Sequence, residues 1–482
     1  MRSRGVEAGV LALMLGAASC GGGGGSPGAA PPPPTGGMTS APVTGTTPPV
    51  TVPDASGSPY TCSDLFDQSA LPAYAFETSA DDWARLDADF HDVTDVLAGT
   101  PPQTTYPVVF HAGNETVNAA VRLRGKSSWV NTVMFDANPK MQFDISFDQT
   151  NSKQTFHGVS TLHFAMPRDD FTFLNERVGN NWLRSLGITA PCSSSATLTV
   201  NGALYGLYVA EEGVNKPLLQ QFFPGNAGGD LFKGGTEAQT NESTADWTRL
   251  QSLQTAPDIA TLQGLADLPH TLLEWGAEVV LEDADGYYGG SHNFYVYDQG
   301  APGYVWLPDH TDSALEWVTL FTSLGVEEHP IYWWIGRPLP DPPAPDYLLV
   351  INDPTWRARY VQAIAAQAAR WNSAQILGWI DAWSAQIAAA VAADPHKWAT
   401  VDQFQAAVAA MRDMAQRRPV YLQRFVSCEN GDPSQSTDAD GDGVPWCDDC
   451  DDNNAAVSPH AAEICGNQLD DNCNGLADEG CP

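Results

Sequence analysis

The chain has 482 residues, of which 58 are Asp or Glu and 23 are Lys or Arg, so its formal net charge is −35. A chain of this length can bury a large hydrophobic core. The excess of acid excludes binding to nucleic acid or anionic lipid through bulk electrostatics, and it suits a soluble secreted or envelope protein.

The first residues have the pattern of a secretory signal, expected over residues 1–19. Arg2 and Arg4 give a positive start, and the apolar run Val10–Ala18 is too short for an ordinary membrane span. Cys20 follows Ala-Ala-Ser and precedes five glycines, which resembles a bacterial lipoprotein cleavage site. We therefore expect a lipidated Cys20 as the only attachment to a membrane, on the cell envelope. Plain secretion with an unpaired cysteine is the alternative.

Residues 20–59 are rich in Gly, Pro, Ser and Thr and have almost no charge. This composition predicts a disordered tether. If Cys20 is lipidated, eight cysteines remain, an even number that favours disulfides in an oxidising compartment. Their connectivity is left open.

Residues 60–430 form the predicted body, with strands first and helices last, an α+β arrangement. The strand-like runs are Tyr106–Phe110, Val117–Leu123, Met141–Phe147, Thr161–Ala165 and a hairpin, Ala196–Val200 with Leu204–Val209, that turns at Asn201-Gly202. Helical spacing is found over Asp81–Val96, Phe173–Leu186, Val214–Phe223, Thr261–Leu281 and, as three helices with breaks at Ser373 and Asp394, over Thr355–Phe425.

The stretch from Leu281 to Asp312 holds two aromatic, strand-like runs, Asn293–Tyr297 and Tyr304–Leu307, joined by a Gly- and Pro-containing turn. Acids precede the first run, ending at Asp285, and others follow the second, Asp309 and Asp312. A hairpin brings its outer ends together, so these carboxylates would converge as ligands of a hard divalent cation. The alternative is that they are solvated loop acids beside a core hairpin.

A short basic segment, RLRGKSSW, contains Arg124 in a chain that is otherwise poor in bases. A Gly flanked by Arg, Lys and Ser can arrange donors around phosphate oxygens, although the spacing of a Walker loop is missing. Lys140 begins the alternating run MQFDISF and could reach a phosphate. An exposed strand end and a solvated lysine are the alternatives.

These segments occur in an order that resembles the spore-coat CotH kinase-like family: RLRGKSSW, PKMQFDISF, NGALYGLYVAEEGVNKPLLQQFF with DLFK, DGYYGGSHNFYVY and WLPDHTD. The resemblance covers roughly Thr78–Phe425. It implies a degenerate, atypical protein-kinase-like fold. It also implies phosphorylation of Ser on extracytoplasmic or spore-surface proteins, with ATP and a divalent metal.

Carried over to this sequence, the resemblance implies roles for individual residues. Arg124 and Lys140 correspond to the phosphate-binding bases. Nucleotide-side positions are Glu211 or Glu212 and Lys233, and metal positions are Asp285, Asn293 and Asp312. The family's Pro-Trp-Asp-x-Asp segment reads Pro-Asp-His-Thr-Asp here, which keeps Asp312 but puts His310 where an acid is usual.

Two functions follow. The first is a kinase that transfers the γ-phosphoryl group of ATP, with Mg²⁺ or Mn²⁺, to Ser or Thr of surface or secreted proteins. In it, Asp309 or Asp312 orients the acceptor hydroxyl. The second is a catalytically inactive surface lipoprotein that binds a partner or assembles a coat. ATP is scarce outside the cytoplasm, which weighs against the first, whereas the joint retention of basic and acidic segments weighs against the second.

Residues 431–482 are dense in Cys and Asp and poor in hydrophobic residues, so this tail requires disulfides, metal or both to fold. Asp438, Asp440 and Asp442, in the pattern DADGDG, predict a calcium loop. It is not an EF-hand, because its twelfth position is Asp449 rather than Glu and flanking helices are missing. For the CxxC at Cys447, disulfides are favoured over zinc. The tail resembles the short metal-binding modules at the ends of many bacterial surface proteins.

Overall fold

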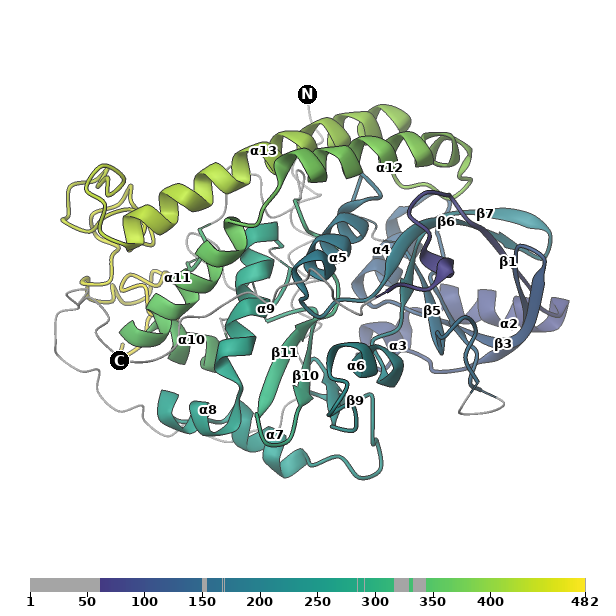
Figure 1. The fold of residues 1–482 in the computed structure, drawn as a ribbon, viewed down its shortest axis with the longest axis horizontal. Helices are drawn as coiled ribbons and strands as arrows, with labels where there is room; N and C mark the ends of the chain where they lie inside the picture. Colours follow the sequence, from purple (N-terminus) through teal and green to yellow (C-terminus); the bar gives the residue numbers. More distant parts are fainter. Residues whose placement is uncertain are drawn as a thin grey trace.

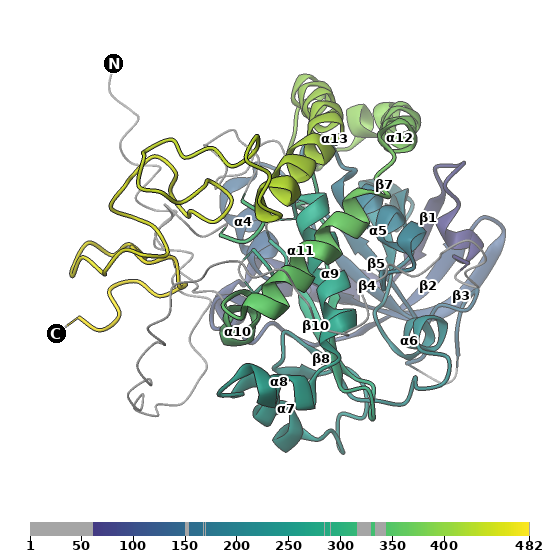
Figure 2. The same cartoon turned by 60° about the vertical axis from the view of Figure 1, so that its left-hand side comes forward.

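The structure is a computed structural model that describes residues 61–149, 154–166, 168, 170–283, 285–289, 291–315, 329–332 and 344–481. The signal, the tether and Cys20 lie outside these residues and stay predictions. Figures 1 and 2 show a barrel at one end of the molecule, a layer of helices in the middle, and the tail at the opposite end.

Seven strands close into a barrel in the order β1-β2-β3-β4-β5-β7-β6. Their bounds are β1 Ala73–Glu77, β2 Tyr106–Ala112, β3 Glu115–Leu123, β4 Phe143–Ser146, β5 Thr161–Ala165, β6 Ser193–Val200 and β7 Ala203–Glu212. All neighbours are antiparallel except β1 and β6, whose parallel pairing closes the barrel. The predicted hairpin is confirmed: Asn201 and Gly202 both have positive φ, 48° and 82°, as its tight turn requires.

Aromatic side chains fill the barrel. Phe76, Phe110, Phe143 and Phe164 are fully buried there. Phe143 meets Phe76 edge to face, with ring centroids 5.3 Å apart. The two-residue period of MQFDISF explains this, because alternate residues of a strand point to the same side. A disulfide between Cys62 and Cys192 ties the start of the described chain to β6.

The barrel is preceded by a short 3₁₀ turn, η1 Asp64–Phe66, and flanked by α2 Ala80–His91, α3 Thr94–Leu97 and α4 Ser127–Phe135. The predicted helix over Asp81–Val96 is therefore two helices, because the chain leaves helical geometry at Asp92, the C-cap of α2. Trp129 of α4 packs on Phe90 of α2 and donates its indole N–H to the Phe90 carbonyl at 2.7 Å.

A second sheet has the order β11-β10-β8-β9. Its strands are β8 Leu231–Lys233, β9 Glu237–Ala238, β10 Phe294–Asp298 and β11 Tyr304–Pro308. The antiparallel pairing of β10 with β11 confirms the predicted aromatic hairpin, in which Phe294 stands opposite Pro308. Asp309 directly follows β11, so the segment that begins there leaves the hairpin at its outer end.

Helices make up most of the remaining described body: α5 Asn175–Leu186, α6 Lys216–Phe222, α7 Trp247–Gln254, α8 Ile259–Leu265, α9 Leu268–Leu281, α10 Pro345–Ile351, α11 Pro354–Ala368, α12 Ser373–Ala393 and α13 Val401–Glu429. The long helices α12 and α13 lie side by side across the body (Figures 1 and 2). By length and composition α12 could cross a membrane, yet Ile376, Ile380 and Trp383 pack into the main core.

The expected mixed α/β arrangement, with strands in the N-terminal half and helices late, is confirmed. The expected kinase-like fold is not confirmed, because the N-terminal strands form a closed barrel. Local patterns indicate strands, but the parallel pairing of β1 with β6 joins segments more than 120 residues apart in sequence, as in Ala73 opposite Thr197.

Disulfides shape the tail. Cys428 pairs with Cys447, Cys450 with Cys473, and Cys465 with Cys481. The preference for disulfides over zinc at the CxxC sequence is confirmed, because each of its cysteines is bonded to a different partner. Cys428 belongs to α13, so the first of these bonds attaches the tail directly to the helical layer.

Candidate functional site

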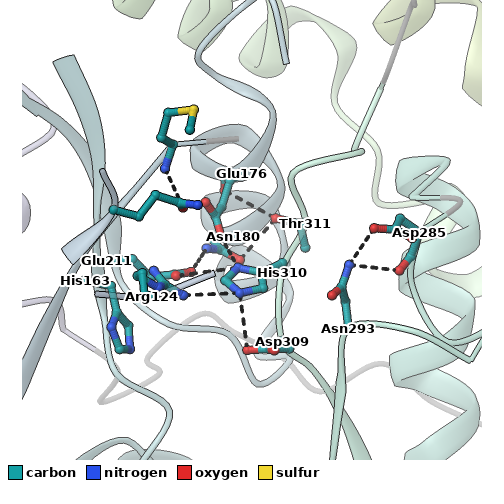
Figure 3. Close-up of polar contacts among 12 residues, drawn as sticks. Arg124, His163, Glu176, Asn180, Glu211, Asp285, Asn293, Asp309, His310 and Thr311 are labelled. Atoms are coloured by element: carbon teal, nitrogen blue, oxygen red, sulfur yellow. Dashed lines mark hydrogen bonds and ion pairs between the residues drawn. The ribbon is translucent and has the colours of Figure 1, made fainter. Parts of the chain in front are cut away.

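His310 lies at the centre of a cluster of charged residues where the segment after β11 meets the barrel and α5 (Figure 3). Its Nδ1 is 2.7 Å from Glu176 Oε1 of α5 and 3.8 Å from Glu211 Oε2 of β7. Its Nε2 is 3.3 Å from Arg124 Nη2 and 3.8 Å from Asp309 Oδ1. Burial alone would lower the pKa of His310, but Asp309 and Glu176 outweigh it and raise that pKa to about 10.

Arg124 follows the end of β3 and is held from one side by Asp144 of β4. Its Nε lies 3.3 Å from Asp144 Oδ1, and Arg122 and His163 contact the same carboxylate at 2.8 and 2.5 Å. Burial opposes the charge of Arg124, but Asp144 and Glu211 raise its pKa, so the guanidinium stays protonated. Its Nη1 is buried and has no hydrogen-bond partner among the described residues.

Asp309 forms an ion pair with Lys233 of β8, Nζ to Oδ2 2.6 Å. Burial would raise the pKa of Asp309, yet His310 and Lys233 hold it well below its usual range. Asp309 is only 5% exposed, whereas the Lys233 side chain is 36% exposed. The ammonium group therefore forms the open edge of the cluster, available to a second anion.

Two buried carboxyl groups, Glu176 and Glu211, lie next to each other. Burial and then Glu176 raise the pKa of Glu211 well above its usual value, whereas His310 outweighs burial and lowers that of Glu176. Asn180 donates to Glu211 at 2.9 Å and accepts from Thr311 at 3.2 Å. Gly179 makes this approach feasible, because a Cβ there would come within 2.4 Å of Thr311 Oγ1.

A second group of acids lies to one side, where Asn293 donates to Asp285 Oδ2 at 2.8 Å (Figure 3). Asp312 is close enough to Asp285 for the two charges to interact. Burial, followed by the neighbouring acids Glu176, Asp285 and Asp170, outweighs the opposing effect of His310 and raises the pKa of Asp312 to about 7. Its Oδ1 is buried and has no partner among the described residues. An orphaned, buried carboxylate oxygen beside other acids fits a cation.

Two predicted site residues lie elsewhere. Lys140 is fully buried and forms an ion pair of 2.6 Å with Asp394, from the segment between α12 and α13, and also donates to the Leu207 carbonyl. Glu212 accepts from the Cys192 amide at 3.2 Å and from Gln221 at 3.1 Å. Glu211 points to the opposite side of β7 because successive strand residues alternate. A role for Lys140 or Glu212 toward nucleotide stays a prediction.

The structure thus gathers Arg124, Glu211, Lys233 and Asp309 around His310, and Asp285, Asn293 and Asp312 beside them. Sequence reasoning missed Glu176 and Asn180 of α5, and Asp144 and His163 of the barrel. No sequence signal marks Glu176, because only the structure shows that ten of the twelve residues of α5 are buried. Asp144, in contrast, interrupts an apolar strand, where a charged residue requires a partner.

In the tail, carboxylate oxygens of Asp438, Asp440 and Asp442 lie within 4.8 Å of one another. Backbone amides of Gly441 and Gly443 donate to Asp438 at 2.7 and 3.0 Å. These three predicted ligands are therefore brought together.

Asp449, which sequence reasoning set aside, interacts electrostatically with acids of this group. Its pKa is raised to about 7 by burial, and then by Asp442, Asp440 and Asp452, against the effect of a hydrogen bond from Asp451. The residue whose identity excluded an EF-hand therefore belongs to the same acidic region of the tail.

Comparison with known proteins finds two family matches, one in the body and one in the tail. The family described as CotH kinase protein matches residues 121–264 and 270–422, which is more than half of the chain. A second family, described as "Putative metal-binding motif", matches residues 449–479 of the tail. No curated protein matches the chain. From the first match, the chain belongs to the CotH kinase protein family.

Proposed function

We propose that the protein is an ATP-dependent phosphotransferase that modifies Ser or Thr hydroxyls of secreted or envelope proteins. The observation that carries the proposal is the buried, unpartnered Nη1 of Arg124, in a cluster whose other cations are paired with acids. A buried guanidinium nitrogen without an acceptor has lost its water without compensation. A phosphate oxygen is the acceptor that it matches best.

The charges around Arg124 support phosphoryl transfer. Lys233 lies at the open edge of the same cluster, so two cations can contact the polyphosphate from different elements. In the reaction, the bond from the γ-phosphorus to the oxygen of the leaving ADP breaks and a bond to the acceptor hydroxyl forms. Asp309 or Asp312 orients the hydroxyl, whose proton is released to water. Fixed positive charge stabilises this transfer, which requires little other chemistry from the protein.

The divalent ion that the family implies fits the second group of acids. Mg²⁺ or Mn²⁺ would be held by Asp285 and Asp312, and when bound it neutralises charge on the phosphates. Asn293 donates to Asp285 Oδ2 at 2.8 Å and His292 Nδ1 lies 3.2 Å from Oδ1, so two neighbours fix the orientation of this carboxylate. Asp309, kept ionised by His310 and Lys233, is suited to accept a hydrogen bond from the acceptor hydroxyl.

We further propose that the protein acts outside the cytoplasm, attached through a lipid on Cys20. The four disulfides within the described chain support an oxidising compartment. A calcium ion in the tail suits the same setting.

A non-catalytic binding module remains the second candidate, because one specific observation favours it. The predicted phosphate lysine, Lys140, is only 1% exposed and is neutralised by Asp394. In this arrangement the charge of Lys140 is already paired and is not available to a nucleotide.

The decisive experiment incubates the mature protein with γ-labelled ATP and Mn²⁺, alone and with a mixture of envelope proteins. Asp309→Asn and Asp285→Asn should each lower label transfer by about 100-fold or more. Asp298→Asn is the matched control, since it lies at the turn end of the same hairpin and pairs with Arg249. If the native protein transfers no label and nucleotide does not raise its melting temperature, the binding module is the better reading.

A further inference from the structure

The tail contains a buried acid, Asp449, that forms no ion pair among the described residues. Asp449 is 2% exposed, and one of its oxygens, Oδ1, accepts from the Asp451 amide at 2.9 Å. The other, Oδ2, is buried without a partner among the described residues, and so is Oδ2 of Asp440. The sequence has no Lys or Arg after Arg424. Two such oxygens would cost several kcal/mol to bury uncompensated, so the folded loop requires a cation.

We propose that Asp438, Asp440, Asp442, Asp449 and Asp452 form one calcium site, and that the ion fastens the tail to the helical body. This inference is independent of the proposed kinase activity. It extends the three-residue loop by two ligands, and it gives the ion a role beyond the tail.

The backbone of the loop holds each of these carboxylates through amide hydrogen bonds, and both oxygens of Asp438 are held in this way. Asp440 Oδ1 accepts from the Asp442 amide at 3.1 Å, and Asp442 Oδ1 accepts from the Val444 amide at 2.8 Å. Asp452 Oδ1 accepts from the Ala439 amide at 2.9 Å, which brings the far end of the segment back to its start. Such preorganised carboxylates lose little further freedom when the ion arrives.

The donor set selects the ion. All five groups are carboxylates, and the nearby thiols of Cys447 and Cys450 are consumed in disulfides. Ligation by several carboxylates and by oxygen alone suits Ca²⁺, whereas Zn²⁺ and Cu²⁺ prefer sulfur or imidazole, and Mg²⁺ keeps most of its waters.

Between Asp442 and Asp449 the loop carries the residues that contact the body. The indole of Trp446 packs against Phe425 of α13, with ring centroids 6.1 Å apart, and the Arg424 guanidinium lies 4.4 Å from its ring centroid. Cys447 is bonded to Cys428 of the same helix. Because ligands stand on both sides of these residues, an ion that fixes the loop also fixes its contacts with α13.

Asp448 extends the attachment to a second helix. Its Oδ1 is 2.9 Å from Nη2 of Arg357 in α11, and the same nitrogen lies 2.7 Å from Glu429 at the end of α13. The other terminal nitrogen of Arg357 donates to the Tyr332 hydroxyl at 2.6 Å. Through Asp448, the loop thus takes part in an ion-pair network that joins α11, α13 and Tyr332.

The test titrates the full mature chain with CaCl₂ in a calorimeter. Asp449→Asn should lose one equivalent of calcium or weaken its binding at least about tenfold, since even indirect partners of a metal cost 10–100-fold. Asp451→Asn is the matched control: it makes the same charge change two residues away, and its carboxylate has no hydrogen bond in the described structure. Equal calcium binding by the two variants would overturn the site.

Hydrogen exchange of the same samples tests the attachment. Calcium should slow amide exchange at the C-terminal end of α13 and the start of α11 in the native protein and in Asp451→Asn, but not in Asp449→Asn. Asp448→Asn should keep the calcium stoichiometry and lose the protection of α11. If calcium binds and neither helix changes, the ion serves the tail alone and the fastening role is wrong.

Discussion

The charged cluster of the body and the acidic loop of the tail, residues 438–452, balance their buried carboxylates in different ways. In the body, buried acids such as Glu176 and Asp309 are balanced by Arg124, His310 and Lys233, all supplied by the chain. In the tail, Asp449 meets only further acids within the loop, and its pKa rises for that reason as well as for burial. Internal counter-charges thus balance the buried acids around His310, whereas the loop over residues 438–452 contains no Lys, Arg or His.

The largest expected loss of stability comes from removing a cationic side chain of the body. Arg124→Ala should destabilise the body by about 3–5 kcal/mol, because it removes a buried positive charge that interacts with both Asp144 and Glu211. Urea unfolding measures the loss. Arg122→Ala is the control: its side chain is 36% exposed although it contacts the same Asp144, so we expect about 1 kcal/mol or less. Equal losses would mean that the charge of Arg124 is not the main stabilising term.

The second largest effect is expected from removing the disulfide that attaches the tail to α13. The double variant Cys428→Ser/Cys447→Ser opens a loop of 19 residues and should cost about 3 kcal/mol in the tail. Because the bond lies beside the calcium loop, we expect the loss to be smaller in calcium than in EDTA. Proteolytic release of residues 431–482, followed by mass spectrometry, reads this out. Identical release in both buffers would mean that the effect of the disulfide does not depend on calcium.

The third prediction uses pH. The pKa of His310 is about 10 in the folded protein, above its ordinary 6.5, so its contribution is complete below pH 6.5 and is lost as the pH rises toward 10. Between pH 7 and pH 9 the native protein should lose about 2 kcal/mol that His310→Gln does not lose. His163 supplies the contrast, because burial outweighs Asp144 and lowers its pKa. His163→Gln should keep the alkaline loss, and an unchanged slope in His310→Gln would contradict the assignment.

The smallest expected effect is the change in stability of the tail when NaCl is raised. In EDTA, raising NaCl should stabilise the tail by about 0.5 kcal/mol, because it screens repulsion among partly exposed acids such as Asp438 and Asp442. In calcium the effect should vanish, since the ion has already neutralised them. Exchange rates of the tail amides measure both, and a salt effect of equal size in calcium would argue against the ion in the loop.

What could be predicted from the sequence follows the range of the interactions. The β10–β11 hairpin and the Asn201-Gly202 turn depend on neighbouring residues, and both were predictable. Lys140 was assigned to phosphate because no local pattern indicates its actual partner, Asp394, which lies 254 residues away. His310 looked like the loss of an acid, and only the fold shows that two glutamates from α5 and β7 surround it.

The parallel pairing of β1 with β6 has a consequence for where the protein can be divided. The family match begins at residue 121, inside β3, so a fragment cut at that border would lack β1 and β2. It would also lose Cys62, the partner of Cys192. Two strands, β3 and β6, would then present unpaired backbone edges, which act as templates for strand exchange between copies. A cut at the border of sequence similarity would thus open the closed barrel and expose edges that can associate with one another.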